Sequence, residues 1–200
     1  MPGKMLLLRH GQIKANRQRR WHGSTDSPLT FIGRRQAKRV SRLLKNQSLS
    51  AVYASPLQRC QQTAALATRH SGLTINTMDG LAEMSVGEWE NTLFKDLAQE
   101  HGFFEKLSAD PDHRAPGGES TAEVFDRAYE ALCEIDANHG ADDVVVVCGH
   151  GVTFGILLAK LINNNPCAWP EFQMSNCGIT EFELSPGPLI ISFNSSYLVT

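Results

Sequence analysis

Two short stretches of the chain are apolar at every position. Met5 to Leu8 and Val144 to Cys148 contain no polar side chain. Continuous apolar runs of this length are typical of strands that are buried on both faces of a mostly parallel sheet. The pattern therefore predicts two central strands, and four further strands at residues 51–54, 73–77, 178–184 and 189–193.

Amphipathic segments lie between the predicted strands. Thr30 can cap a helix in which small and apolar residues recur on one face and six basic residues of 34–45 fill the others. Ser120 and Glu123 form a capping-box pattern that opens a second helix. Further helices are predicted at 57–69, 92–107 and 153–162. Strands that alternate with helices predict an α/β fold, here a three-layer α/β/α sandwich with a mostly parallel central sheet.

Length and composition favour one globular domain over residues 1–200. A hydrophobic fraction of 42% with 20% charged residues excludes a disordered, collagenous or coiled-coil chain. We expect residues 79–118, which end in an irregular loop, to be an inserted segment that covers the active site. Five scattered cysteines without a C-x-x-C pair favour free thiols over disulfides or a metal site, so we expect a cytoplasmic protein.

Positive charge is concentrated in the first quarter of the chain. Residues 1–50 hold 12 of the 19 Lys and Arg residues but a single acidic residue, Asp26. Such asymmetry favours a nucleic acid, a membrane surface or an anionic small molecule as partner. Nucleic-acid binding calls for aromatic side chains among the basic ones, and only Trp21 and Phe31 lie there. Since no apolar run approaches the length of about 18 residues that spans a bilayer, we expect neither a nucleic-acid nor a membrane partner.

A His-Gly pair follows each of the two central strands, as His10-Gly11 and His150-Gly151. Ligands of open α/β sheets bind beyond the carboxyl ends of the strands, where a glycine lets the backbone approach a ligand closely. One histidine at a strand end is more often structural, but two at equivalent places indicate a binding or catalytic site.

The run Arg9-His10-Gly11-Gln12, followed by Asn16, resembles the signature of the histidine phosphatase superfamily in its phosphoglycerate mutase-like branch. Further blocks resemble those of the family in the family's order, at residues 21–33, 55–64, 81–90, 116–120 and 147–151. The Arg-His-Gly triplet alone is a weak signal, whereas the ordered set is specific. The resemblance implies a metal-independent phosphomonoesterase that acts through a phosphohistidine intermediate on a small phosphorylated metabolite, without a cofactor.

The resemblance also implies which residues act. The implied catalytic residues are Arg9, His10, Arg59, Glu83 and His150. The implied phosphate-binding residues are Arg9, Gln12, Asn16, Arg59, His150 and Gly151. His10 is the nucleophile and Glu83 the general acid and base. Guanidinium groups near His10 disfavour its imidazolium form, which keeps a ring nitrogen able to attack phosphorus.

Other interpretations of these patterns stay open. Mutase-type phosphoryl transfer shares the same core residues, and a catalytically silent phosphate-binding module is an alternative of another class. Glu83 lies near Glu88 and Glu90, which can be solvated surface charges. Cys148 reads as a small buried strand residue and Trp89 as a packing residue. The physiological substrate and a homodimer also remain open.

Four positions depart from the usual residues of the family. Ile13 replaces a hydroxyl residue, Asn91 a glycine, Gly149 a Ser or Thr, and Gly155 an arginine. None of the four is an implied catalytic group. The departures therefore bear on substrate identity and catalytic rate more than on reaction type.

Overall fold

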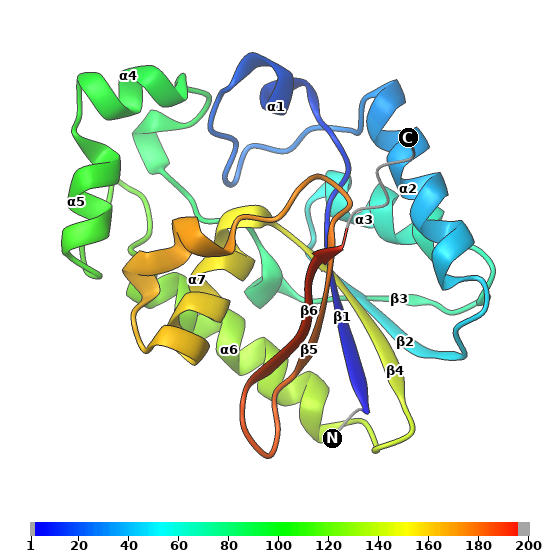
Figure 1. Cartoon of the computed structure of the whole chain (residues 1–200). Helices are drawn as coiled ribbons and strands as arrows, with labels where there is room; N and C mark the ends of the chain where they lie inside the picture. Colours follow the sequence, from blue (N-terminus) through cyan, green and yellow to red (C-terminus); the bar gives the residue numbers. More distant parts are fainter. Residues whose placement is uncertain (1–2, 196–200) are drawn as a thin grey trace.

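The computed structural model describes residues 3–195 and contains a six-stranded sheet in the order β3-β2-β4-β1-β5-β6 (Figure 1). The strands are β1 (Lys4–Arg9), β2 (Leu49–Ala54), β3 (Ile75–Thr77), β4 (Val144–Gly149), β5 (Ile179–Glu183) and β6 (Leu189–Ser195). The pairs formed by β3, β2, β4 and β1 are parallel, whereas β5 and β6 continue the sheet antiparallel. All six strands lie at the predicted segments, and the mostly parallel sheet is confirmed.

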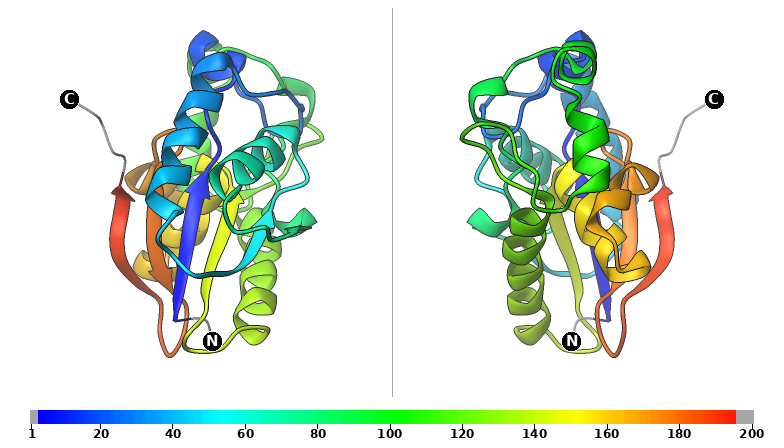
Figure 2. Two further views of the ribbon diagram at one scale, coloured as in Figure 1. Left: turned by 90° about the vertical axis from the view of Figure 1, so that its right-hand side faces the viewer. Right: turned by 90° about the vertical axis from the view of Figure 1, so that its left-hand side faces the viewer.

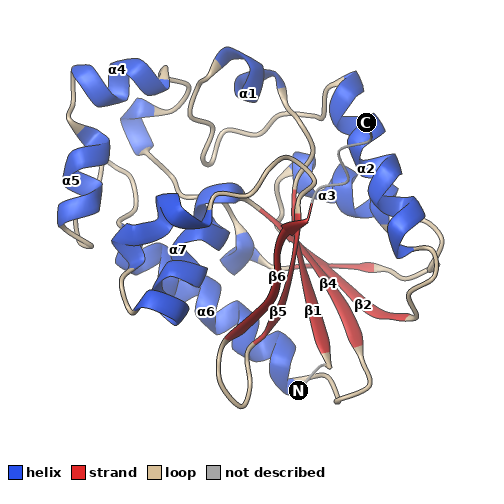
Figure 3. Ribbon diagram, in the orientation of Figure 1, coloured by secondary structure: helices blue, strands red, loops and turns tan. Residues whose placement is uncertain are grey.

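Helices cover both faces of the sheet (Figure 3). They are α1 (Lys14–Gln18), α2 (Phe31–Leu44), α3 (Gln58–Ala67), α4 (Phe94–Gln99), α5 (Phe103–Ala109), α6 (Thr121–Ala137) and α7 (Gly151–Asn163), with 3-10 turns η1 (Asp79–Leu81), η2 (Gly87–Trp89) and η3 (Pro166–Phe172). Thr30 caps α2 by accepting a hydrogen bond from the Gly33 N–H at 3.0 Å. Ser120 and Glu123 form the predicted capping box of α6.

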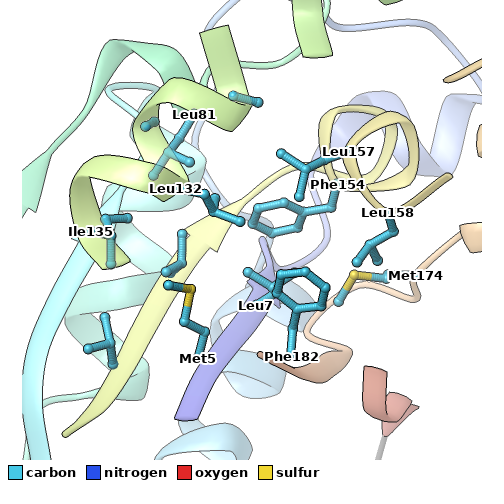
Figure 4. Packing of buried hydrophobic residues seen from close by; sticks show 14 of the residues in the cluster. Met5, Leu7, Leu81, Leu132, Ile135, Phe154, Leu157, Leu158, Met174 and Phe182 are labelled. Atoms are coloured by element: carbon cyan, nitrogen blue, oxygen red, sulfur yellow. The ribbon is translucent and has the colours of Figure 1, made fainter. Parts of the chain in front are cut away.

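Alternate side chains of β1 enter two different cores. Met5 and Leu7 pack with α6 and α7 (Figure 4), whereas Leu6 and Leu8 pack with α2 and α3. Figure 2 shows α2 and α3 in front of the sheet from one side, and α6 and α7 in front of it from the other. Burial on both faces is the physical reason for the uninterrupted apolar run, and it confirms the three-layer sandwich.

The helices of residues 79–118 differ from those predicted. The predicted helix over 92–107 is wrong, because the chain forms two short helices, α4 and α5, separated at Gly102. Gly102 has a φ of +58°, a left-handed conformation that glycine adopts at low cost and that ends a right-handed helix. The segment lies beside α1 (Figure 1), where Leu93 forms a β-bridge with Arg20.

The cysteines agree with the free-thiol prediction. All five are free, and Cys148 is buried in β4. Burial raises the pKa of the Cys148 thiol well above its ordinary value, and the neighbouring Cys60 raises it further. A thiol in this state is a poor nucleophile, which agrees with the interpretation of Cys148 as a packing residue. Over residues 3–195 no helix combines the length and the apolar character needed to cross a membrane.

Candidate active site

The parallel register of β1 and β4 brings the two His-Gly pairs together. Arg9 is the register partner of Gly149, so His10 and His150 follow at the same edge of the sheet. The His10 N–H donates to the Gly149 carbonyl at 3.0 Å, and the two imidazole centroids are 5.3 Å apart in an edge-on arrangement. The sheet thereby places both histidines in one site.

His10 carries its proton on a defined ring nitrogen. Nδ1 lies 2.7 Å from the carbonyl oxygen of Gly11, and a carbonyl oxygen can only accept, so Nδ1 is the protonated atom. Burial lowers the pKa of His10 well below its ordinary value, and the guanidinium groups of Arg9 and Arg59 lower it further. His10 is therefore a neutral imidazole at neutral pH, with a lone pair on Nε2.

His150 is a second neutral imidazole, with the opposite tautomer. Arg59 Nε donates to His150 Nδ1 at 3.2 Å, so the ring proton lies on Nε2, which donates to Ser55 Oγ at 2.8 Å. Burial lowers the pKa of His150 well below its ordinary value, with the Arg59 charge as the next contribution. The ring of His150 is thus fixed from two sides.

The guanidinium of Arg59 is completely buried and donates to backbone carbonyls. Nη1 donates to Thr25 at 2.8 Å, and Nη2 donates to Gly23 at 2.7 Å and to His22 at 3.2 Å. Neither Arg59 nor His150 is among the described residues that line the adjacent cavity. Both side chains lie in a buried layer next to His10.

The cavity is lined by five of the eight implied catalytic and phosphate-binding residues, which are Arg9, His10, Asn16, Glu83 and Gly151. Arg9 Nη1 donates to the carbonyl of Met174. Its Nε is buried and has no hydrogen-bond partner among residues 3–195. Gly151 begins α7 directly against this side chain, because a Cβ on Gly151 would lie 3.0 Å from Arg9 Nε. The glycine leaves room for the Arg9 guanidinium.

The carboxylate of Glu83 is held at the N-terminus of α7. Oε1 accepts from the backbone N–H and the hydroxyl of Thr153, both at 2.9 Å, and from the Met84 N–H at 3.1 Å. Among the described residues, Oε2 accepts only from the Val152 N–H, at 3.3 Å. The N–H groups of the first helical turn therefore hold the Glu83 side chain at the cavity wall. Oε2 keeps hydrogen-bonding capacity for a ligand in the cavity.

The side chain of Asn16 is oriented by a residue that sequence reasoning missed. Asn16 Oδ1 accepts from the Ile13 N–H at 3.0 Å and from Asn176 Nδ2 at 3.2 Å, which leaves the Asn16 amide NH₂ to donate. Asn176 also donates to the backbone carbonyl of His10 at 3.1 Å. Asn176 lies in the loop between η3 and β5, where no periodic pattern distinguishes it from other polar residues.

Gln12 and Trp89 are also named from the sequence, whereas His22 is not. Gln12 does not line the cavity, and its Oε1 accepts from the hydroxyl of Thr30 at 3.1 Å. His22 does line the cavity, with Nε2 3.0 Å from Asn91 Oδ1. Trp89 is partly buried among the aromatic side chains that pack around α5, as predicted.

Comparison with known proteins identifies the family. The profile described as the histidine phosphatase superfamily (branch 1) matches residues 5–194. The chain belongs to the histidine phosphatase superfamily. A probable phosphoglycerate mutase of Yersinia pestis is 32% identical to it over 192 residues, which cover 94% of this chain and 88% of that protein.

Solved structures resemble this histidine phosphatase over nearly its whole length. A mycobacterial glucosyl-3-phosphoglycerate phosphatase in complex with VO3 has a TM-score of 0.87 at 26% identity and covers 96% of this chain and 99% of its own. A phosphoserine phosphatase of Entamoeba histolytica, in complex with 3-phosphoglyceric acid, has a TM-score of 0.86 at 28% identity and covers 98% of each chain. The family and these neighbours identify the chain as a phosphatase, and they do not favour a mutase or a silent binding module.

Three of the four departures of this histidine phosphatase from the usual family residues have local structural reasons. A Cβ on Gly149 would lie 2.5 Å from the ring of Phe154, and a Cβ on Gly155 would lie 2.9 Å from the carbonyl of Trp169. A larger residue at 155 would displace η3, which brings Trp169 to the cavity wall. Asn91 has a left-handed conformation with a φ of +63°, which glycine adopts readily and asparagine tolerates.

Proposed function

We propose that His10 Nε2 attacks the phosphorus of a phosphomonoester and that the ester oxygen leaves as an alcohol. In this first step the P–O bond to the leaving group breaks, an N–P bond to His10 forms, and Glu83 supplies the proton that the leaving alkoxide takes up. Arg9 and the amide NH₂ of Asn16 line the cavity beside His10, so both can donate to the transferring phosphoryl oxygens.

In the second step, water attacks the phosphorylated His10. Glu83 Oε2 takes a proton from the water as the new P–O bond forms and the N–P bond breaks, which regenerates the neutral imidazole and releases inorganic phosphate. Each step transfers one phosphoryl group and one proton, so the cycle is balanced without an oxidant or a cofactor. The developing negative charge is met by fixed cationic and amide donors, and for this reason we propose a metal-independent reaction.

The observation that carries this proposal is the tautomer of His10. The hydrogen bond from Nδ1 to the Gly11 carbonyl fixes the ring proton on Nδ1, and the depressed pKa of His10 keeps the ring neutral. The nucleophilic lone pair on Nε2 therefore exists at neutral pH without a separate base. His10 thus has a neutral ring with a free lone pair on Nε2 and also lines the cavity.

The lining of the cavity supports the proposal that the substrate is a phosphate ester of a small, partly apolar alcohol. Besides the implied phosphate-binding and catalytic residues, the wall carries the apolar side chains Ile13, Trp21, Phe94, Val152, Trp169 and Met174, and the polar side chains Arg20, His22 and Gln173. Phe94 is the most accessible of the aromatic residues there, at 39% exposed. We propose that an apolar body of the leaving alcohol packs on Phe94. A cytoplasmic location is part of the same proposal, supported by the five free thiols.

The test measures phosphate release from p-nitrophenyl phosphate in the presence of a chelator. The unmodified protein is expected to turn over, and His10→Ala to release no phosphate while still binding vanadate, a phosphate mimic. A 32P-labelled substrate should leave label on the unmodified protein after acid-free quenching. Loss of all activity in chelator would refute the metal-free step, and a fully active His10→Ala would refute the nucleophile. A parallel assay of phosphoglycerate interconversion distinguishes hydrolysis from mutase-type transfer.

A further inference from the structure

Glu90 is the last residue of the block Gly87-x-Trp89-Glu90 and has no part in the proposed chemistry. Its carboxylate accepts hydrogen bonds from the backbone N–H groups of Gly23 at 3.0 Å, Ser24 at 3.1 Å and Thr25 at 3.2 Å. The Thr25 hydroxyl donates to it at 2.6 Å and the Val86 N–H at 3.2 Å. The expectation that Glu90 can be a solvated surface charge is therefore wrong.

These contacts keep Glu90 ionised. Burial by itself raises the pKa of the carboxyl group, but the hydrogen bonds from Thr25, Val86 and Ser24 outweigh burial and lower the pKa below its ordinary value. An ionised carboxylate that accepts hydrogen bonds from several N–H groups fixes the backbone that carries them. If the backbone moved away, a partly buried charge would be left without hydrogen-bond partners.

The same loop faces Arg59 with its carbonyl groups. Within residues 3–195 no side-chain anion pairs with the Arg59 guanidinium. Instead, the carbonyls of His22, Gly23 and Thr25 accept hydrogen bonds from its Nη1 and Nη2. The backbone of residues 22–25 thus lies between two charged groups. The Glu90 carboxylate accepts hydrogen bonds from its N–H groups, and the Arg59 guanidinium donates to its C=O groups. Gly23 is needed for this close approach, because a Cβ there would lie 2.5 Å from Glu90 Oε1 and 2.1 Å from the Met84 carbonyl.

We propose that Glu90 is a positioning residue for phosphoryl transfer, acting through the loop of residues 22–25 on Arg59. The remaining donor of Arg59, Nε, holds His150 in the tautomer with the proton on Nε2. Arg59 also supplies positive charge beside His10. This proposal rests on the proposed function, since it assigns importance to Arg59 and His150 in the same reaction.

The test compares Glu90→Gln with Glu88→Gln. Glutamine keeps the shape of Glu90, but its NH₂ group cannot accept an N–H and its charge is gone. Glu88 is exposed and lies two residues earlier, so its substitution removes the same charge without touching the loop. Below the unfolding temperature of both variants, kcat for p-nitrophenyl phosphate is expected to fall about tenfold or more in Glu90→Gln. It should stay within about twofold in Glu88→Gln, and Glu90→Asp should recover part of the loss.

A second readout separates positioning from general stability. In 15N-histidine-labelled protein, the His150 signals, assigned by their loss in His150→Gln, report which ring nitrogen is protonated. The unmodified protein and Glu88→Gln should show a proton fixed on Nε2, and Glu90→Gln should show mixed tautomers, because Arg59 Nε no longer holds Nδ1. If Glu90→Gln does not fold, Thr25→Val removes the shortest Glu90 contact and is measured in the same way.

A folded Glu90→Gln protein with unchanged kcat and an unchanged His150 tautomer would overturn the proposal. The NMR comparison needs no turnover, so it tests whether Glu90 positions Arg59 even if the unmodified protein hydrolyses no ester. A turnover failure of the unmodified protein, with the tautomer change still present in Glu90→Gln, would refute the proposed function and not the positioning of Arg59 by Glu90.

Discussion

Replacing Gly151 by alanine tests how closely the site controls Arg9. The added Cβ would lie 3.0 Å from Arg9 Nε, 3.1 Å from Cζ and 3.4 Å from Cδ, whereas ordinary contacts lie at 3.4–4 Å. The guanidinium must therefore move by a few tenths of an ångström. It cannot move freely, because Nη1 is tied to the Met174 carbonyl and Nε is already buried.

This displacement should reduce activity without destabilising the fold. A misplacement of 1 Å costs on the order of 100-fold in rate, so a shift of a few tenths should lower kcat/KM by about five- to tenfold. Gly151 is the first residue of α7 and has no left-handed φ, and alanine there restricts the unfolded chain. The free energy of unfolding should thus stay the same or rise by up to about 1 kcal/mol.

The assay combines kcat/KM for p-nitrophenyl phosphate with urea unfolding of the same preparations. Gly187→Ala is the matched control, since a Cβ there meets nothing within 4 Å. It should leave kcat/KM unchanged and, like Gly151→Ala, raise the free energy of unfolding by no more than about 1 kcal/mol. If Gly151→Ala keeps kcat/KM within about twofold of the control, Arg9 is not positioned by this close approach. A decrease of more than about 2 kcal/mol in the free energy of unfolding would show that the alanine strains the fold and does not merely displace the guanidinium.

Three further predictions follow from named contacts. The pKa values of His10 and His150 are depressed below 6.5 by burial, so their contribution to stability is fully present above pH 6.5 and is lost as the pH falls toward the folded-state pKa values. The free energy of unfolding should drop by about 1.4 kcal/mol per pH unit for each histidine in that interval, and His10→Gln should remove one such contribution in urea titrations between pH 7 and 5. Asn176→Leu removes the donor to Asn16 and should lower kcat/KM about tenfold, while Asn176→Gln restores part of it; equal activity of all three proteins would contradict the orienting role. Phe94→Ala should lower kcat/KM for benzyl phosphate about tenfold and leave glycerol 3-phosphate within about twofold, and parallel losses for both esters would refute the apolar contact.

The amino-acid pattern was sufficient for the architecture. Uninterrupted apolar runs at 5–8 and 144–148 identify strands covered on both faces, and Thr30 and Ser120 mark helix starts, because these signals depend on neighbours within a few residues. The His-Gly pairs could be placed at one edge, since parallel strands end together. The break at Gly102 could not be predicted, because glycine is tolerated inside helices and its left-handed φ depends on how α4 and α5 pack.

Only the tertiary structure decided what each polar side chain of the site contacts. The sequence could not show that the Arg59 guanidinium donates to the carbonyls of residues 22–25, or that the Glu90 carboxylate accepts from the N–H groups of the same loop. It also could not show that Asn176 orients Asn16. These contacts join residues more than 30 positions apart, and their geometry depends on how several loops close on one another. The order of apolar and polar residues determines the layers, whereas the packing of the loops determines which nitrogen of each histidine carries a proton.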